Sequence, residues 1–308
     1  MQAVASDPSV PTRHPPKRVR SYLPILLIAP SVILLVALIA YPLIFALKNS
    51  FYFWNLQTSS EPVMFVGLAN YKMVLQGSEF FPSLWNTLVL TVSGTAIEFA
   101  LGLAIALLLA NRMPGMSISR AILIMPTTIA PIVVGFLFRY MYDPSGGLVT
   151  WGLSSIGLDP PSAGILGSAS TSLIAILAAD VWQWTPFFAI TLYAGLLSVS
   201  PDLIEAARLD GASAATILWR IKLPLIMKTA VIVLILRFMQ LFNTFDLVLI
   251  LTRGGPGTSS RTLGYTLYQQ GLIDFNIGIA SATTWLVVII VNAIVGLYAF
   301  FAFRNWEW

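Results

Sequence analysis

The sequence contains no cysteine and a single histidine, His14, and only 10% of its 308 residues are charged. Without cysteine, neither a disulfide framework nor a thiolate metal site can form. His14 lies in a proline-rich N-terminal stretch, so we predict no metal site and no redox chemistry. The phosphate-binding pattern G-x-x-x-x-G-K-[ST] is also missing, which indicates that this chain does not carry the usual ATP-binding loop.

Apolar residues dominate the sequence. Hydrophobic residues make up 57% of the chain, and its mean hydropathy is +0.83, whereas roughly a quarter of the residues of a soluble globular protein are charged. The chain is therefore expected in a membrane. Its formal charge of +4 is explained better by basic residues kept in cytoplasmic loops than by a nucleic-acid partner, and no nucleic acid is expected.

Apolar runs of about 20 residues, the length that crosses a ~30 Å hydrocarbon core, occur six times. Continuous runs favour helices over the alternating strands of a β-barrel. The first lacks an Ala-x-Ala cleavage pattern, which favours a retained anchor over a signal peptide. We expect an all-α integral membrane protein with six transmembrane helices, a disordered tail over residues 1–21 and one membrane domain over residues 22–308. The runs cover residues 22–47, 85–110, 119–141, 172–197, 228–251 and 279–303.

Lysine and arginine set the expected orientation. Eleven of them fall in segments that lie inside if the N-terminus is cytoplasmic, and four fall outside. Basic residues stay on the cytoplasmic side, so both termini and the polar connection 198–227 are predicted there. Asp202, Glu205 and Asp210 in this connection resemble a carboxylate cluster, but the first two follow Ser200 and Pro201, where they suit a helix N-terminus. Catalysis is therefore not expected.

The order of residues in this connection is specific. Glu205-Ala206-Ala207 is followed by three residues, then Gly211, then nine residues, then Ile221-Lys222-Leu223-Pro224. This pattern resembles the EAA loop of ABC-importer permeases, EAA-x3-G-x9-I-x-LP. Further stretches resemble the carbohydrate branch of that family. These stretches are "NTLVLTVSG", "RAILIMPTTIAPIVVGFLFRYMYDPSGGL", "DVWQWTPF" and "FNTFDLVLILTRGGP". The last is similar to the maltose-type permease that pairs with a second, distinct permease, and the whole resemblance covers roughly residues 22–303.

The resemblance implies a type I ABC importer permease fold in the plasma (inner) membrane of a prokaryote. The chain would form half of the pathway of an ATP-driven importer of a sugar or sugar derivative, and would not itself be an enzyme. Implied partners are a second permease in a heterodimer, two copies of a cytoplasmic ABC ATPase that binds ATP and Mg, and an extracytoplasmic substrate-binding protein. The alternative, an ion-coupled secondary transporter, would often show inverted repeats and would not need the EAA segment.

Within the polar connection, small residues beside a few charges suit a short helix that docks on another protein. The resemblance assigns this coupling role to Glu205, Ala206, Ala207, Arg208 and Gly211, and Leu223-Pro224 is expected to end the element before the fifth span. The alternative, an amphipathic helix on the lipid surface, needs a broad apolar face that the alanine-rich stretch lacks.

Charged residues inside the spans are costly in hydrocarbon unless they are paired or face water. Glu98 and Arg237 lie near the middles of the second and fifth spans, where we expect a buried ion pair. The alternative is that Arg237 contacts substrate. Asp180, Asp246 and Arg139 lie nearer the outer face, where snorkelling or local pairing accounts for them.

Two helical stripes combine polar and aromatic side chains, the mixture that covers a sugar ring and binds its hydroxyls. The fourth and fifth spans each carry one at intervals of three and four residues. We expect them to line the substrate path, with helix-to-helix packing as the alternative. The members are Asp180, Gln183, Trp184 and Phe187 in one stripe, and Arg237, Gln240, Leu241 and Thr244, with Asn243 alongside, in the other.

Overall fold

The computed structural model describes residues 23–110 and 116–304. The predicted tail, residues 1–21, lies outside the described residues. The chain divides into two units, Met1–Phe45 and Ala46–Trp308. Five continuous helices are long and apolar enough to cross a membrane, and a bent pair of helices brings the number to six if it counts as one span. These agree with the six apolar runs in number and order.

The helix α1 (Leu23–Ser50) includes the first predicted span. Its segment Leu26–Ser50 reaches a mean hydropathy of 2.5. After it come a short antiparallel pair of strands, β1 (Tyr52–Phe53) and β2 (Met64–Phe65), and the helix α2 (Ala69–Gln76). The Asn70 side chain donates to the carbonyls of Ser50 and Tyr52, at 2.8 and 2.9 Å. These bonds fix the start of α2 against the C-terminal end of α1.

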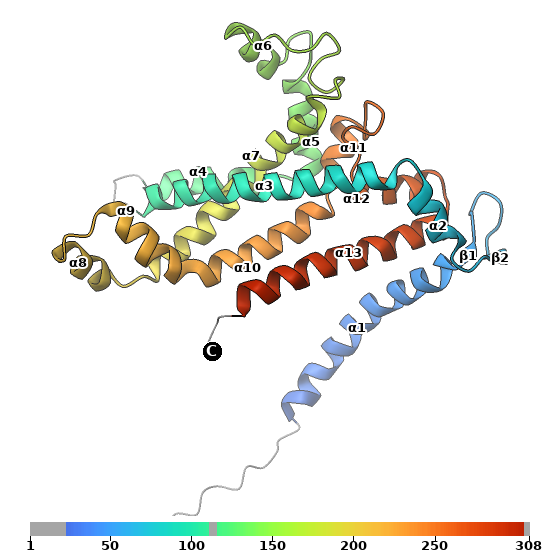
Figure 1. Cartoon of the computed structure of the whole chain (residues 1–308), viewed down its shortest axis with the longest axis horizontal. Helices are drawn as coiled ribbons and strands as arrows, with labels where there is room; N and C mark the ends of the chain where they lie inside the picture. The colour runs from blue at the N-terminus through green and yellow to red at the C-terminus, as the bar shows by residue number, and fades with distance from the viewer. Residues whose placement is uncertain (1–22, 111–115, 305–308) are drawn as a thin grey trace, which may run out of the picture. The chain divides into compact units, whose positions relative to one another are not determined.

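Four long helices form the frame of the unit that begins at Ala46 (Figure 1). They are α3 (Phe80–Leu109), α7 (Ser172–Leu197), α10 (Leu223–Phe242) and α13 (Ile277–Phe303). α3 packs closely on α7 because Gly102 has no side chain, and a Cβ there would overlap Phe188. α3 begins at Phe80 rather than at residue 85, which extends the predicted span.

The third predicted span, residues 119–141, is wrong as a single straight helix. It consists of α4 (Met116–Thr128) and α5 (Pro131–Met141), which meet at 95°. The break precedes Pro131, and the residue before a proline is driven out of the helical region. Ala130 accordingly has φ −59° and ψ 136°. Proline sterics therefore override the apolar pattern at this point.

The fifth predicted span, residues 228–251, is also divided. α10 ends at Phe242, and the short helix α11 (Asp246–Leu251) follows after a break of three residues. At the other end, α9 (Ala214–Ile217) runs through a π-helical turn (Leu218–Lys222) directly into α10. The prediction that Leu223-Pro224 ends the element is wrong, since the helix continues and Pro224 lies in the first turn of α10.

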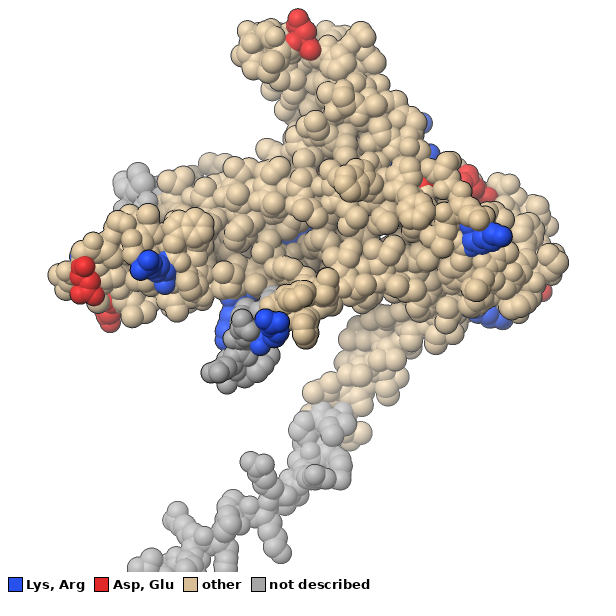
Figure 2. Space-filling view, viewed as in Figure 1, with Lys and Arg blue, Asp and Glu red and all other residues tan. Residues whose placement is uncertain are grey.

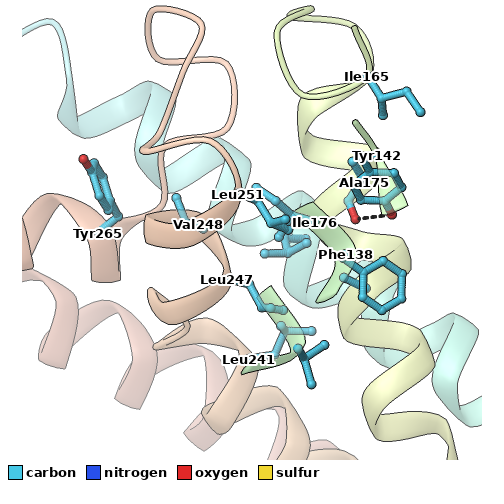
Figure 3. Packing of buried hydrophobic residues seen from close by; sticks show 13 residues of the cluster. Phe138, Tyr142, Ile165, Ala175, Ile176, Leu241, Leu247, Val248, Leu251 and Tyr265 are labelled. Atoms are coloured by element: carbon cyan, nitrogen blue, oxygen red, sulfur yellow. Dashed lines mark hydrogen bonds between the residues drawn. The ribbon is translucent and has the colours of Figure 1, made fainter. Parts of the chain in front are cut away.

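The remaining helices lie between these spans. α6 (Leu148–Ser155) follows α5, α8 (Pro201–Leu209) precedes α9, and α12 (Leu263–Tyr268) precedes a second π turn (Gln269–Ile273). One apolar cluster joins α5, α7, α10 and α11, and includes Phe138, Ile176, Leu241 and Val248 (Figure 3). It holds the short helix α11 against the longer ones.

Charged side chains avoid the middle of the Ala46–Trp308 unit on the face shown in Figure 2. They show mainly at the end that holds α8, beside the C-terminal end of α13, at the opposite end around α2, and near α6, and most of the surface between is uncharged. Such a band is what a hydrocarbon environment requires, because a charged side chain in lipid is costly. α13 ends at the same end of the unit as α8 (Figure 1).

Candidate functional site

Three charged side chains from three helices meet in the interior. Arg237 on α10 donates from Nε to Glu98 Oε2 on α3 at 2.8 Å and from Nη2 to Glu98 Oε1 at 2.9 Å. Nη2 also pairs with Asp180 on α7. All three residues are buried, at 2% exposure or less. The sequence predicts only the Glu98–Arg237 pair, and Asp180 adds a second carboxylate that the stripe pattern assigns to the substrate path.

The rest of the Arg237 guanidinium is also occupied. Its Cζ lies 4.8 Å from the centre of the Trp184 ring, and Nη1 donates to Gln240 Oε1 at 3.3 Å. A cation over an indole face is attracted by the ring quadrupole. Two members of the predicted stripes, one on α7 and one on α10, therefore meet at Arg237.

A cavity of about 130 Å³ lies beside this charge cluster. Seven of the eight residues predicted for the substrate path line it, so the two stripes come together as their spacing predicts. Phe187 is the exception, and it packs against the Trp184 ring with centroids 6.2 Å apart. The lining residues are Pro131, Asp180, Gln183, Trp184, Arg237, Gln240, Asn243, Thr244, Phe245, Asp246 and Leu247.

Gln183 has a structural role that the sequence does not reveal. Its Nε2 donates to the carbonyl of Ile129 at 2.8 Å, in the break between α4 and α5. The hydroxyls of Thr127 and Thr128 bond to other carbonyls of α4, at 2.7 and 2.8 Å. A bend inside a membrane leaves carbonyl groups that must find partners. The Gln183 amide supplies one of them and links α7 to the bend.

The remaining residues singled out from the sequence make contacts other than those of the charge cluster. Asn243 is exposed, and its amide donates to the carbonyl of Met239 at 2.8 Å. The carbonyl of Thr244 accepts from the hydroxyl of Thr262 at 3.0 Å. Leu241, in the same predicted stripe, belongs to the apolar cluster and is 1% exposed. Arg139, expected to pair locally, donates from Nη1 to the carbonyl of Ile250 at 3.0 Å.

The predicted coupling segment folds as two short helices around a tight turn. The Ser200 hydroxyl accepts from the backbone N–H of Asp202 at the start of α8, and the Ser213 hydroxyl accepts from that of Thr216 at the start of α9. Gly211 joins them with φ +79°, a left-handed conformation that favours glycine. Its space is otherwise open, since no described atom lies within 4 Å of a Cβ built there. Glycine is therefore needed for the backbone angle.

The predicted coupling residues lie on an accessible surface. Glu205, Ala206, Arg208 and Gly211 are exposed and Ala207 is half-buried. Apolar side chains accompany them, because Leu203 is 51% exposed and Leu209 is 89% exposed. From the sequence, no broad apolar face is expected here. The two exposed leucines add an apolar component to this surface. Such a mixture of leucine, alanine and single charges suits a protein partner.

The long apolar helices and the buried polar cavity between them are features of a multi-pass membrane protein that moves a polar solute. Residues 98–306 match the family described as "Binding-protein-dependent transport system inner membrane component", and the chain belongs to this family. It is therefore a permease subunit of an ABC importer in the inner membrane, and not an ion-coupled secondary transporter.

Two relatives agree with this assignment, and a solved structure shares the fold. The chain is 38% identical over 236 residues to the trehalose/maltose transport system permease protein MalF of Thermococcus litoralis, covering 76% of this chain and 79% of the relative. It is 30% identical over 280 residues to the sn-glycerol-3-phosphate transport system permease protein UgpA of Agrobacterium fabrum, covering 88% and 92%. A bacterial ABC transporter involved in the import of alginate shares the fold, with a TM-score of 0.79 at 23% identity, covering 94% of this chain and 97% of that one.

Proposed function

We propose that this permease forms one half of the translocation pathway of a sugar importer. The observation that carries the proposal is the cavity between α7, α10 and α11, where amide, hydroxyl and carboxylate groups lie beside the Trp184 ring. Sugars present apolar C–H faces that pack on aromatic rings and hydroxyls that bond to amides and carboxylates. The relative that transports trehalose and maltose makes these sugars the first candidates.

The other half of the pathway comes from a second, distinct permease in a heterodimer. Two copies of a cytoplasmic ATPase, which bind ATP and Mg, supply the energy, so this chain is not itself an enzyme. An extracytoplasmic binding protein delivers the sugar. A similar solved structure, a bacterial alginate ABC transporter in complex with alginate pentasaccharide-bound periplasmic protein, supports this last partner.

The segment 198–227 is the contact with the ATPase, with Glu205, Ala206, Ala207, Arg208 and Gly211 as the coupling residues. Its exposure and its preformed turn at Gly211 support this role. A rigid short helix that fits a groove transmits the movement of a partner without first paying the entropy of ordering. Closure of the ATPase on ATP would then move α8 and, through the continuous α9–α10 helix, the cavity wall.

The test is reconstitution of this permease with its partner permease, ATPase and binding protein in proteoliposomes. We expect ATP-dependent accumulation of radiolabelled trehalose or maltose that disappears when any one component is omitted. Preparations that hydrolyse ATP in response to another class of solute, and accumulate no sugar, would contradict the proposal. A permease with a deleted α8 segment, residues 201–209, serves as the uncoupled control.

A further inference from the structure

The charges around the cavity are unequal. Asp180 and Asp246 line it, and Arg237 is the one basic residue among the described residues that line it. The Arg237 guanidinium already pairs with the carboxylates of Asp180 and Glu98, so the Asp246 carboxylate is additional. Asp246 is half-buried at the start of α11 and forms no ion pair within the described part of the chain. The cavity wall therefore carries an excess of acidic groups.

Arg237 has little capacity left for a ligand. Nε and Nη2 bond to the carboxylates of Glu98 and Asp180, and Nη1 bonds to Gln240. One face of the guanidinium lies over the Trp184 ring, and the side chain is 1% exposed. A phosphate or carboxylate binds arginine through paired N–H donors. Such a ligand would have to displace a buried carboxylate first.

A neutral hydrogen-bond acceptor, by contrast, remains without a partner at the cavity wall. Gln183 is fully buried at the cavity wall, and its Oε1 has no hydrogen-bond partner in the described chain. Asn243 and Thr244 line the same space. A buried acceptor without a partner is costly, and a hydroxyl can donate to it. The Trp184 ring offers an apolar face beside these groups.

Building on the proposed function, we propose that this cavity admits uncharged, hydroxyl-rich solutes and excludes solutes that carry a phosphate, sulfonate or carboxylate. The neutralised guanidinium offers anions no counter-charge, and the additional carboxylate of Asp246 repels them. One uncompensated negative charge in a protein interior lowers the local concentration of a monovalent anion by about 10-fold or more. The importer would then differ in substrate class from the relative that transports sn-glycerol 3-phosphate.

The absence of native cysteine makes a direct test possible. Asn243→Cys is placed in the complete importer and treated with neutral, cationic and anionic methanethiosulfonates of similar size. The reference is Ser154→Cys, an exposed position on α6, which has no charged residue of its own. We expect the ratio of anionic to neutral reaction rates to be about 10-fold lower at position 243 than at position 154. Asp246→Asn should raise that ratio at position 243.

Equal ratios at the two positions would overturn the proposal. So would a failure of both Asn243→Cys and Gln240→Cys to react with any reagent while Ser154→Cys reacts, because the cavity would then not be open to solutes. The rates require no transport, so they separate this inference from the proposed function. Anion exclusion without ATP-dependent sugar uptake contradicts only the sugar importer, and sugar uptake without anion exclusion contradicts only the charge selectivity.

Discussion

Arg237 holds the polar centre of the helix bundle together, because it is the counter-charge of both Glu98 and Asp180. Removing the partner of a buried charge costs about 3–5 kcal/mol, since an uncompensated ion stays behind. We therefore expect Arg237→Met to lower the thermal unfolding midpoint of the purified permease complex strongly. Glu98→Gln should lower it less, because the amide oxygen still accepts from Nε and Asp180 still pairs. Equal shifts for the two variants would contradict this assignment.

Trp184 touches both the guanidinium and the cavity, so its ring should matter for transport. Trp184→Ala removes the aromatic face, whereas Trp184→Phe keeps a smaller one. We expect sugar uptake by the reconstituted importer to fall at least about 10-fold in the alanine variant and clearly less in the phenylalanine variant. Size-exclusion chromatography of both complexes checks assembly. If the two variants transport alike, the ring serves packing and not the substrate.

The Gln183 side chain supports the α4–α5 bend, because its amide donates to the carbonyl of Ile129 within the break. Gln183→Leu leaves the Ile129 carbonyl without this partner, at a cost of about 1–3 kcal/mol. Hydrogen exchange of the segment 126–134 should therefore quicken in Gln183→Leu. Thr191→Val, which removes a hydroxyl bonded within α7 alone, is the matched control and should leave that segment unchanged.

Among the helices, the apolar pattern predicts a continuous span where proline predicts a break. The apolar runs predict where the chain crosses the membrane, because the hydrophobic effect acts on whole segments. They do not predict the 95° bend before Pro131 or the break between Phe242 and Asp246. Pro131 is a residue in the sequence that could have indicated the bend. The break between Phe242 and Asp246 has no such signal, because the packing of α11 in the apolar cluster decides it.

The coupling turn offers a test at the same scale. Gly211 has φ +79°, which costs most residues about 1–2 kcal/mol, whereas asparagine adopts it more readily. We expect Gly211→Val to disconnect ATP hydrolysis from uptake and Gly211→Asn to retain most coupling. Glu205→Lys should also uncouple, through charge rather than through backbone strain. The measurement is the ratio of sugar transported to ATP hydrolysed. Wild-type ratios in Gly211→Val and Glu205→Lys would remove the coupling role from this segment.

At the scale of the molecule, residue spacing predicts the site better than it predicts the helices. Intervals of three and four residues place Asp180, Gln183 and Trp184 on one face of α7, and the cavity brings them opposite Arg237 and Gln240 of α10. The pairing of Asp180 with Arg237 could not be predicted, because it depends on the rotation of two helices about their axes. Nothing in a single sequence fixes that rotation, which follows from side-chain packing across the bundle.

The orientation of the whole chain is the remaining prediction. Arg208 lies on α8, and Arg220 and Lys222 lie in the first π turn, so this end is expected in the cytoplasm together with both termini. Single cysteines at Ser213 and Ser154 test it, since both positions are exposed and the chain has no other cysteine. In intact cells, an impermeant maleimide should label position 154 and spare position 213. After the membrane is opened both should react, and labelling of position 213 before that step would reverse the topology and remove the ATPase from reach of α8.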